Sequence, residues 1–119
     1  MQPNGAHAMR IAYVFSTSNA SYILEKMILP QLEAGTHGVT VVGMFFFVDN
    51  NYLLQEGNPT AERLAAIAKN TGMLVMGCDQ CCEQRRIDDK IQAPFVIGCF
   101  PNLYGAIQGA GGVDQVITL

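Results

Sequence analysis

The cysteines of this 119-residue chain are concentrated in one short segment. Three of the four lie within residues 77–82 (Gly-Cys-Asp-Gln-Cys-Cys), and the fourth is Cys99. An apolar run ends just before this segment and a polar, helix-compatible run follows it, so Cys78 is expected where a buried strand passes into a helix. The partial positive charge of a helix N-terminus favours thiolate over thiol. The sequence therefore predicts a nucleophilic thiol at Cys78, with a pKa below the usual value of about 8.5.

Cys81 stands three residues beyond Cys78, a spacing used by dithiol oxidoreductases and by metal knuckles. Residues i and i+3 share a face in the first turn of a helix, so the two sulfur atoms can approach each other. Cys81 is therefore a candidate resolving thiol, without the aromatic-Cys-Gly-Pro-Cys context of thioredoxin-like sites. Cys82 points about 100° away from Cys81 around the helix axis. Its side chain is therefore expected in the core or in an interface.

Cys99 follows the next strand expected after the one that ends near Cys78. If these two strands are neighbours in the sheet, Cys99 lies close to Cys78. Cys99 would then attack a persulfide formed on Cys78, complete a metal site, or simply fill the core. The sequence leaves these three roles open.

A metal site formed by Cys78, Cys81 and Cys99 is the main alternative to nucleophilic chemistry. A strong zinc signature pairs two Cys-x-x-Cys units, and this chain contains one such unit. His7 falls in the N-terminal lead-in, and His37 falls in a loop at the opposite, amino edge of the expected sheet. Both histidines are interpreted as solvated residues. The sequence therefore favours a reactive thiol without any cofactor.

The composition excludes several classes of partner. The formal net charge is −3 and the seven Lys and Arg residues are scattered, which argues against binding to nucleic acid. The longest apolar run, residues 39–48, is too short to span a membrane. No secretion signal is recognisable, so a cytoplasmic location with reduced thiols is expected. Half of the residues are apolar and 14% are charged, which suggests a homo-oligomer.

Arg85 and Arg86 are expected to pair with Asp88 and Asp89 on the surface, or else to hold an anionic sulfur carrier.

Short apolar runs alternate with helix-compatible segments along the chain. Strands are expected at residues 10–15, 39–48, 73–76, 95–99 and 115–119. Helices are expected at residues 20–34, 59–70, 78–86 and 103–108, with residues 49–58 ambiguous. Pro30 should kink or break the first helix near Leu29. This alternation predicts a single domain over residues 10–119, after a disordered lead-in at 1–9: a three-layer α/β/α sandwich with a mainly parallel five-stranded sheet.

The expected fold brings four polar or thiol-bearing segments together. Residues 16–19, residues 49–51, Cys78 and Cys99 each follow an expected strand. In parallel α/β folds, ligands and reactive groups gather beyond the carboxyl ends of the strands. These four segments are therefore expected at one edge of the sheet.

Three stretches of the chain resemble the DsrE/DsrF-like family of small sulfur-relay proteins. They are the opening strand at 10–15 with its Ser/Thr-rich turn, Cys78 with the helix that ends in Arg-Arg-Ile at 85–87, and the tail at 105–119 with its Asp-x-Val-Ile-Thr-Leu strand. The resemblance implies that Cys78 is the sulfur-accepting cysteine and that the protein forms homo- or hetero-oligomers. It implies no role for Cys81, Cys82 or Cys99.

The sequence thus predicts a sulfur-relay protein that carries a persulfide on Cys78 and transfers it to an acceptor thiol. Its partners would be sulfur donor and acceptor proteins. Whether the protein acts as a catalytic sulfurtransferase or as a simple carrier is left open. The alternative is a non-catalytic metal-binding or thiol-redox module that uses Cys78, Cys81 and Cys99.

Overall fold

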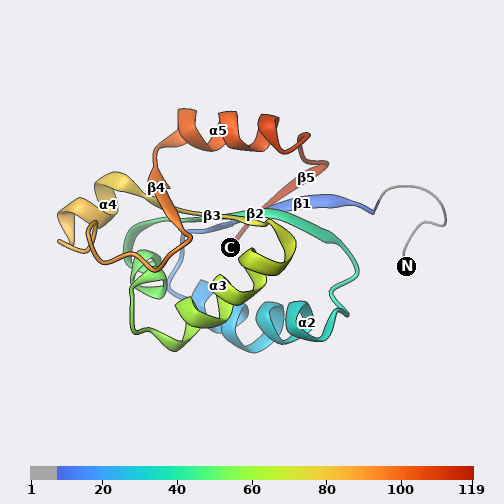
Figure 1. The fold of residues 1–119 in the computed structure, drawn as a ribbon, viewed down its shortest axis with the longest axis horizontal. Helices are drawn as coiled ribbons and strands as arrows, with labels where there is room; N and C mark the ends of the chain where they lie inside the picture. Colours follow the sequence, from blue (N-terminus) through green and yellow to red (C-terminus); the bar gives the residue numbers. More distant parts are fainter. Residues whose placement is uncertain (1–7) are drawn as a thin grey trace.

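The computed structural model describes residues 8–119 and contains one five-stranded sheet in the order β4-β3-β2-β1-β5 (Figure 1). All neighbouring strands are parallel. The strands are β1 (Arg10–Phe15), β2 (Thr40–Phe46), β3 (Leu74–Cys78), β4 (Val96–Gly98) and β5 (Gln115–Thr118). The predicted α/β class with five strands is confirmed, and the sheet is parallel throughout.

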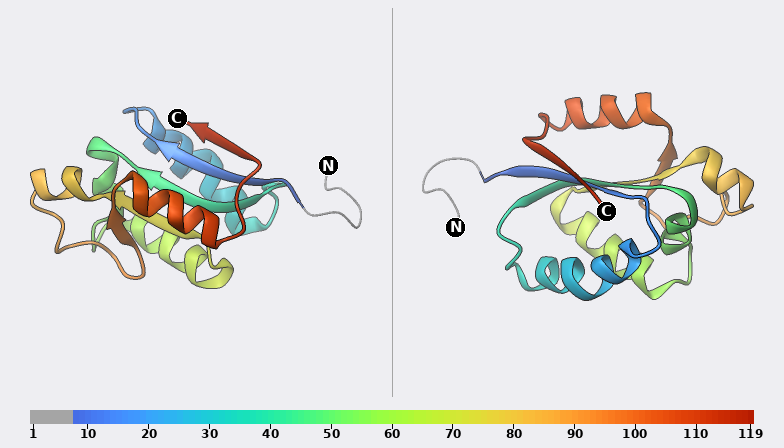
Figure 2. Two further views of the ribbon diagram at one scale, coloured as in Figure 1. Left: turned by 90° about the horizontal axis from the view of Figure 1, so that it is seen from above. Right: turned by 180° about the vertical axis from the view of Figure 1, so that it is seen from behind.

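Helices cover the two faces of the sheet unequally. One face carries α1 (Ala20–Ile23), the π-helical turn η1 (Leu24–Ile28), α2 (Leu29–Ala34) and α3 (Pro59–Thr71), whereas the other carries α5 (Phe100–Gly109) (Figure 1). Viewed from the α5 side, β1 and β5 extend beyond the area that this helix covers (Figure 2, left). The short α4 (Asp79–Gln84) and the 3-10 helix η2 (Val48–Leu54) lie at the carboxyl ends of the strands.

The hydrophobic core is divided accordingly. Phe45 and Phe46 are both buried in β2, and because successive side chains of a strand point to opposite faces, each belongs to a different cluster. The larger cluster contains Phe46 and lies against α1 to α3. The smaller cluster contains Phe45, Met76, Cys78 and Leu103 and lies against α5. The principal thiol candidate therefore belongs to the smaller core.

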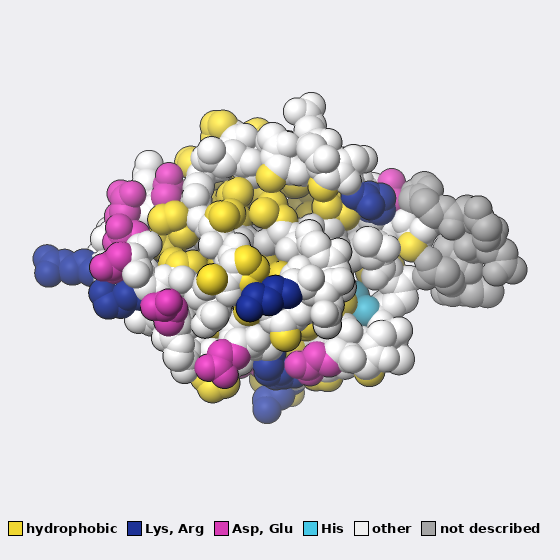
Figure 3. Space-filling model, viewed as in Figure 1, with side chains coloured by type: hydrophobic (Ala, Val, Ile, Leu, Met, Phe, Trp, Pro, Cys, Tyr) yellow, Lys and Arg dark blue, Asp and Glu magenta, His cyan; other side chains and the backbone are white. Residues whose placement is uncertain are grey.

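The face beneath α5 is partly open. Apolar side chains gather there around a hollow in the surface (Figure 3). The hollow has a volume of about 250 Å³ and extends from β1 and β2 to α5. Phe100 is 43% exposed, Tyr104 61% and Val116 51%. This face therefore keeps apolar surface in contact with solvent.

The first long helix is continuous over residues 20–34, and its hydrogen-bond pattern changes just before Pro30, where a kink or break was expected. Residues 24–28 form a π-helical turn in which the N–H of Leu29 donates to the carbonyl of Leu24, five residues earlier. Pro30 has no N–H to donate and follows this turn two residues later within the continuous helix, so the altered hydrogen-bond pattern lies where the proline interrupts the regular one. Gly35 ends the helix with a φ of 71°.

Other element boundaries follow local signals. Asn58 caps α3 by accepting a hydrogen bond of 2.9 Å from the N–H of Thr60, and Gly72 ends that helix with a φ of 76°. The last helix begins at Phe100, earlier than expected, because Pro101 fits its first turn. The ambiguous segment becomes η2. The predicted lead-in at 1–9 falls mostly outside the described residues, and among residues 8–119 no helix is long and apolar enough to cross a membrane.

Candidate thiol site

The carboxyl ends of the parallel strands meet beside α4, as the sequence predicts (Figure 2). Cys78 is the last residue of β3 and also the N-cap of α4. It pairs with Gly98 of β4, so Cys99 is the next residue along the neighbouring strand. The Asn50 amide donates to the carbonyl of Thr17 at 3.0 Å, which joins the segments that follow β1 and β2.

Cys78 and Cys81 lie in contact within the first turn of α4. The backbone N–H of Cys81 donates to the Sγ of Cys78 at 3.4 Å. The two thiol side chains also interact with each other. The Cys-x-x-Cys spacing therefore produces the close pair of thiols that the sequence predicts.

Burial reverses the predicted direction of the Cys78 pKa. The side chain is 8% exposed and packs in the apolar cluster beneath α5. Desolvation is the largest effect and raises the pKa of Cys78 above its usual value, and the neighbouring Cys81 thiol raises it further. The backbone N–H groups of Cys81 and Gln80 act in the opposite direction but do not outweigh burial. The expectation of a lowered pKa was wrong, because it considered the helix terminus without the surrounding core.

Cys81 has a different environment. It is partly exposed, and its Sγ accepts a hydrogen bond of 3.3 Å from the backbone N–H of Val48. Val48 adopts a φ of 46°, which is unusual for a β-branched residue. Arg85 lies close enough to interact electrostatically with the Cys81 thiol, and its Nη1 donates to the Cys81 carbonyl at 3.2 Å.

Arg85 forms its ion pair with a residue that the sequence does not suggest. Its Nε lies 2.8 Å from the Oδ1 of Asp49. The predicted pairing with Asp88 or Asp89 was wrong for Arg85, and Asp89 pairs with Lys90 instead. Asp49 belongs to η2, so its ion pair with Arg85 links that segment to the end of α4.

Asn51 is a fully buried polar residue that holds the thiol-bearing turn. Its Oδ1 accepts from the backbone N–H of Cys78 at 3.0 Å and from the Cys82 thiol at 3.3 Å. Its Nδ2 donates to the carbonyl of Val48 at 2.9 Å. A Cβ at Gly77 would lie 2.6 Å from the Asn51 Oδ1, so glycine allows this approach. Asn51 lies at the edge of the sheet where the sequence predicts it, but no local sequence signal indicates these contacts.

Cys82 belongs to the core, as predicted. Its side chain is completely buried, and burial together with the nearby Cys78 and Cys81 thiols raises its pKa to about 12. Cys99 is partly exposed and precedes α5, where its backbone N–H donates to the Oδ1 of Asn102 at 2.9 Å. All four cysteines are free thiols.

The ligand set of the metal alternative does not assemble within residues 8–119. No three Cys, His, Asp or Glu side chains in this part of the chain are placed to hold a metal ion, so Cys78, Cys81 and Cys99 do not form such a group. His37 is not the solvated residue that was expected. Its Nε2 lies 2.8 Å from the Tyr13 hydroxyl, and its Nδ1 lies 2.8 Å from the Gln31 Oε1. Burial lowers the pKa of its imidazole. His7 lies outside the described residues.

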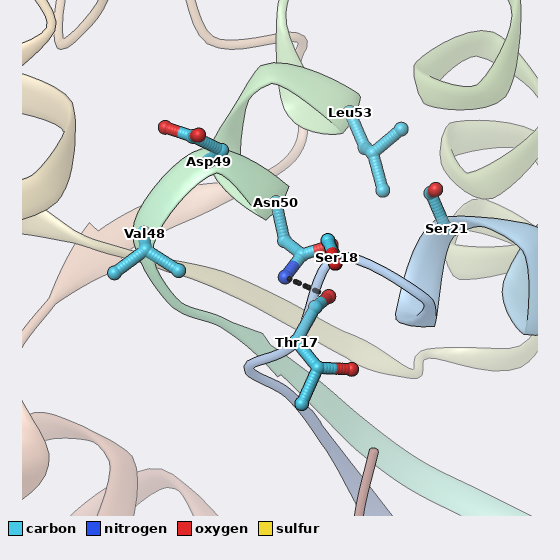
Figure 4. Close-up of a pocket in the computed structure, with 7 residues that line it drawn as sticks. All are labelled: Thr17, Ser18, Ser21, Val48, Asp49, Asn50 and Leu53. Carbon is cyan, nitrogen blue, oxygen red and sulfur yellow. Dashed lines mark hydrogen bonds between the residues drawn. The ribbon is translucent and has the colours of Figure 1, made fainter.

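A cavity of about 320 Å³ lies near the carboxyl ends of β1 and β2 (Figure 4). It is formed by the loop after β1 and by η2, and its lining residues are Thr17, Ser18, Ser21, Val48, Asp49, Asn50 and Leu53. Val48 lines this cavity, and its N–H contacts the Cys81 sulfur. The cavity thus adjoins the Cys81 side of the pair.

Comparisons with known proteins identify the fold. The sequence matches no protein-family profile. No curated protein sequence matches it either. The YchN protein of E. coli is similar in structure, with a TM-score of 0.66 and 15% identity over 94% of this chain and 99% of that one.

Two other solved structures share this architecture. One is MTH1491 from Methanobacterium thermoautotrophicum, a protein of unknown function, with a TM-score of 0.66 and 10% identity over 93% of this chain and 99% of its own. The other is BT1422 from Bacteroides thetaiotaomicron, a conserved protein of unknown function, with a TM-score of 0.63 and 12% identity over 92% and 94% of the two chains. At such identities the similarity establishes the α/β fold alone.

Proposed function

We propose that this chain is a sulfur carrier of the DsrE/DsrF-like type, which holds sulfane sulfur as a persulfide on Cys78 and passes it to an acceptor thiol. The observation that carries the proposal is the Cys78–Cys81 contact at the carboxyl end of β3. Two free thiols in the first turn of one helix, joined by this backbone–sulfur hydrogen bond and placed at the edge where α/β folds gather their reactive groups, suit sulfur exchange.

The chemistry needs no cofactor. In the loading reaction, a cysteine thiolate attacks the outer sulfur of a donor persulfide. A new S–S bond forms, the donor S–S bond breaks, and the donor leaves as a thiol. In the unloading reaction, an acceptor thiolate attacks the outer sulfur of the Cys78 persulfide and regenerates the Cys78 thiol. No net oxidation occurs, because one S–S bond replaces another.

The burial of Cys78 suits the storage of this sulfur. Its neighbours in the smaller cluster are Phe45, Met76 and Leu103. A persulfide enclosed by these side chains is shielded from small reductants in solution, since exchange with a thiol requires access to the sulfur atoms. Storage therefore depends on the core that raises the Cys78 pKa.

The partners of such a carrier are sulfur donor and acceptor proteins, and its location is the cytoplasm, where thiols remain reduced. A homo-oligomer completes the proposal. It is supported by the apolar surface beneath α5, where Tyr104 and Val116 are more than half exposed. Burying such a surface in a subunit interface would remove it from water.

The test is to incubate the protein with inorganic polysulfide, desalt it and measure its intact mass. Each bound sulfur adds about 32 Da. Tandem mass spectrometry of the tryptic peptide spanning residues 70–85 then locates the sulfur, and we expect it on Cys78. Cys99→Ser is the matched control and should load like the wild type. If the double variant Cys78→Ser/Cys81→Ser gains as much sulfur as the wild type, the proposed function is wrong.

A thiol-redox function is the second candidate, favoured by the same contact. Cys81 thiolate would attack the inner sulfur of a Cys78 persulfide, forming the Cys78–Cys81 disulfide and releasing hydrogen sulfide. The sulfane sulfur is reduced in this step and the two cysteines are oxidised. Accumulation of the disulfide together with sulfide, instead of a stable persulfide, would favour this function over sulfur storage.

A further inference from the structure

We infer that sulfur is first accepted by Cys81 and moves from there to Cys78. This inference rests on the proposed function and specifies its reaction order. It assigns to Cys81 the attack on the donor, a role different from that of a resolving thiol.

Exposure distinguishes the two sulfur atoms. Cys78 is 8% exposed and belongs to the cluster under α5, so a donor persulfide meets packed side chains in front of it. Cys81 is partly exposed and lies one helical turn farther along α4. Because thiol exchange requires the attacking sulfur to reach the donor S–S bond, Cys81 is the accessible partner of the pair.

The surroundings of Cys81 also suit the negative charge that develops during exchange. The N–H of Val48 points at the Cys81 Sγ from η2, at 3.3 Å. The guanidinium of Arg85 lies beside the same residue: its Nη1 donates to the Cys81 carbonyl at 3.2 Å, and its Nε is held by Asp49 at 2.8 Å. An N–H donor and a guanidinium stabilise the thiolate that attacks the donor and the thiolate that leaves after transfer.

The second step is an exchange between neighbouring cysteines. Cys78 thiolate attacks the outer sulfur of the Cys81 persulfide, the S–S bond to Cys81 breaks, and the Cys81 thiolate takes up the proton that Cys78 lost. The backbone contact of 3.4 Å between the Cys81 N–H and the Cys78 Sγ shows that the two residues already lie together. The apolar surroundings that raise the pKa of Cys78 make it a slow direct acceptor, whereas transfer from an adjacent persulfide needs no approach from solvent.

The experiment is a rapid-quench loading time course with inorganic polysulfide as the donor. Samples are alkylated and the peptide spanning residues 70–85 is sequenced by mass spectrometry, which separates Cys78 from Cys81. In the wild type we expect sulfur on Cys81 first and on Cys78 later. The Cys78→Ser variant should keep its sulfur on Cys81, and Cys81→Ser should load Cys78 at least about 10-fold more slowly than the wild type. Arg85→Gln should slow loading by about 3- to 10-fold, and Cys99→Ser should not change it.

The outcomes separate this inference from the proposed function. If Cys78→Ser takes up no sulfur and Cys81→Ser loads at the wild-type rate, sulfur goes directly to Cys78; the inference is then wrong and the sulfur carrier remains. If the double variant loads like the wild type, the sulfur-carrier proposal itself fails. Sulfur trapped on Cys81 in the Cys78→Ser variant supports the inference even if the Cys81→Ser variant does not fold. Circular dichroism spectra of each variant show whether it is folded.

Discussion

The chain contains two similar turns that differ in their neighbours. The turn from β3 to α4 and the turn from β4 to α5 each place a cysteine at the N-cap of a helix, at Cys78 and Cys99. Each cysteine follows a buried glycine, and the two strands are adjacent in the sheet. The backbone settings of the two thiols are therefore alike.

A third segment makes the difference. The short helix η2 packs against the first turn, where Asn51 accepts from the Cys78 N–H and Val48 donates to Cys81. At the second turn, the N–H of Cys99 is bound by Asn102 of its own helix. A cysteine at a helix N-terminus is thus common to both turns. Contacts from a distant segment of the chain distinguish the turn at Cys78 from the turn at Cys99.

The largest expected difference between the turns is chemical. The double variant Cys78→Ser/Cys81→Ser should reduce the sulfur that can be transferred to an acceptor thiol by at least about 100-fold, because both sulfur-binding nucleophiles of the first turn are lost. Cys99→Ser should stay within about 2-fold of the wild type. The measurement is transfer of labelled sulfur to a small acceptor thiol after the loaded protein has been desalted and denatured. Equal losses in both variants would remove the distinction between the turns.

The two asparagines should differ in their contribution to stability. Asn51→Ala removes the hydrogen-bond acceptor of the buried Cys78 N–H and of the buried Cys82 thiol, and it should lower the free energy of unfolding by about 2–4 kcal/mol. Asn102→Ala removes an exposed cap and should cost about 1 kcal/mol or less. Urea unfolding of both variants checks this order, and a larger loss for Asn102→Ala would contradict it.

The two glycines provide a finer comparison. An added Cβ at Gly77 would lie 2.6 Å from the Oδ1 of Asn51, which is buried and held by several hydrogen bonds. At Gly98, an added Cβ would lie 2.9 Å from the Cβ of Asn102 on the partly open α5. We expect Gly77→Ala to cost about 2–3 kcal/mol and Gly98→Ala about 1 kcal/mol, since α5 can shift outward more easily. Thermal unfolding of the two variants measures the difference, and similar costs would show that η2 is no more rigid than α5.

The smallest expected effect is a pH dependence of stability from the first turn. Burial raises the pKa of Cys82 from 9.0 to about 12, so above pH 9 the unfolded chain loses this proton while the folded protein keeps it. The unfolded state then binds fewer protons, and the free energy of unfolding falls as the pH rises from 9 towards 12. Urea unfolding at about pH 8 and about pH 10 should show this loss. Cys82→Ala should make it shallower, and an unchanged slope in that variant would show that Cys82 is not its source.

Much of the fold was predictable because its signals are local. The alternation of apolar runs with helix-compatible segments predicted the α/β class, Pro30 predicted an irregularity in the first helix, and Gly35 predicted its end. Asn58 predicted the start of α3. Each of these signals acts through backbone geometry within a few residues, so it operates in the same way in any tertiary context.

The sequence by itself determined which residues could do chemistry and at which edge of the sheet they would lie. Tertiary structure decided how those residues behave. The raised pKa of Cys78, the hydrogen bond that Asn51 accepts from its N–H across 27 positions, and the ion pair between Arg85 and Asp49 across 36 positions all depend on packing. Desolvation and hydrogen bonding are set by the atoms that surround a group in space, and those atoms come from segments that are distant along the chain.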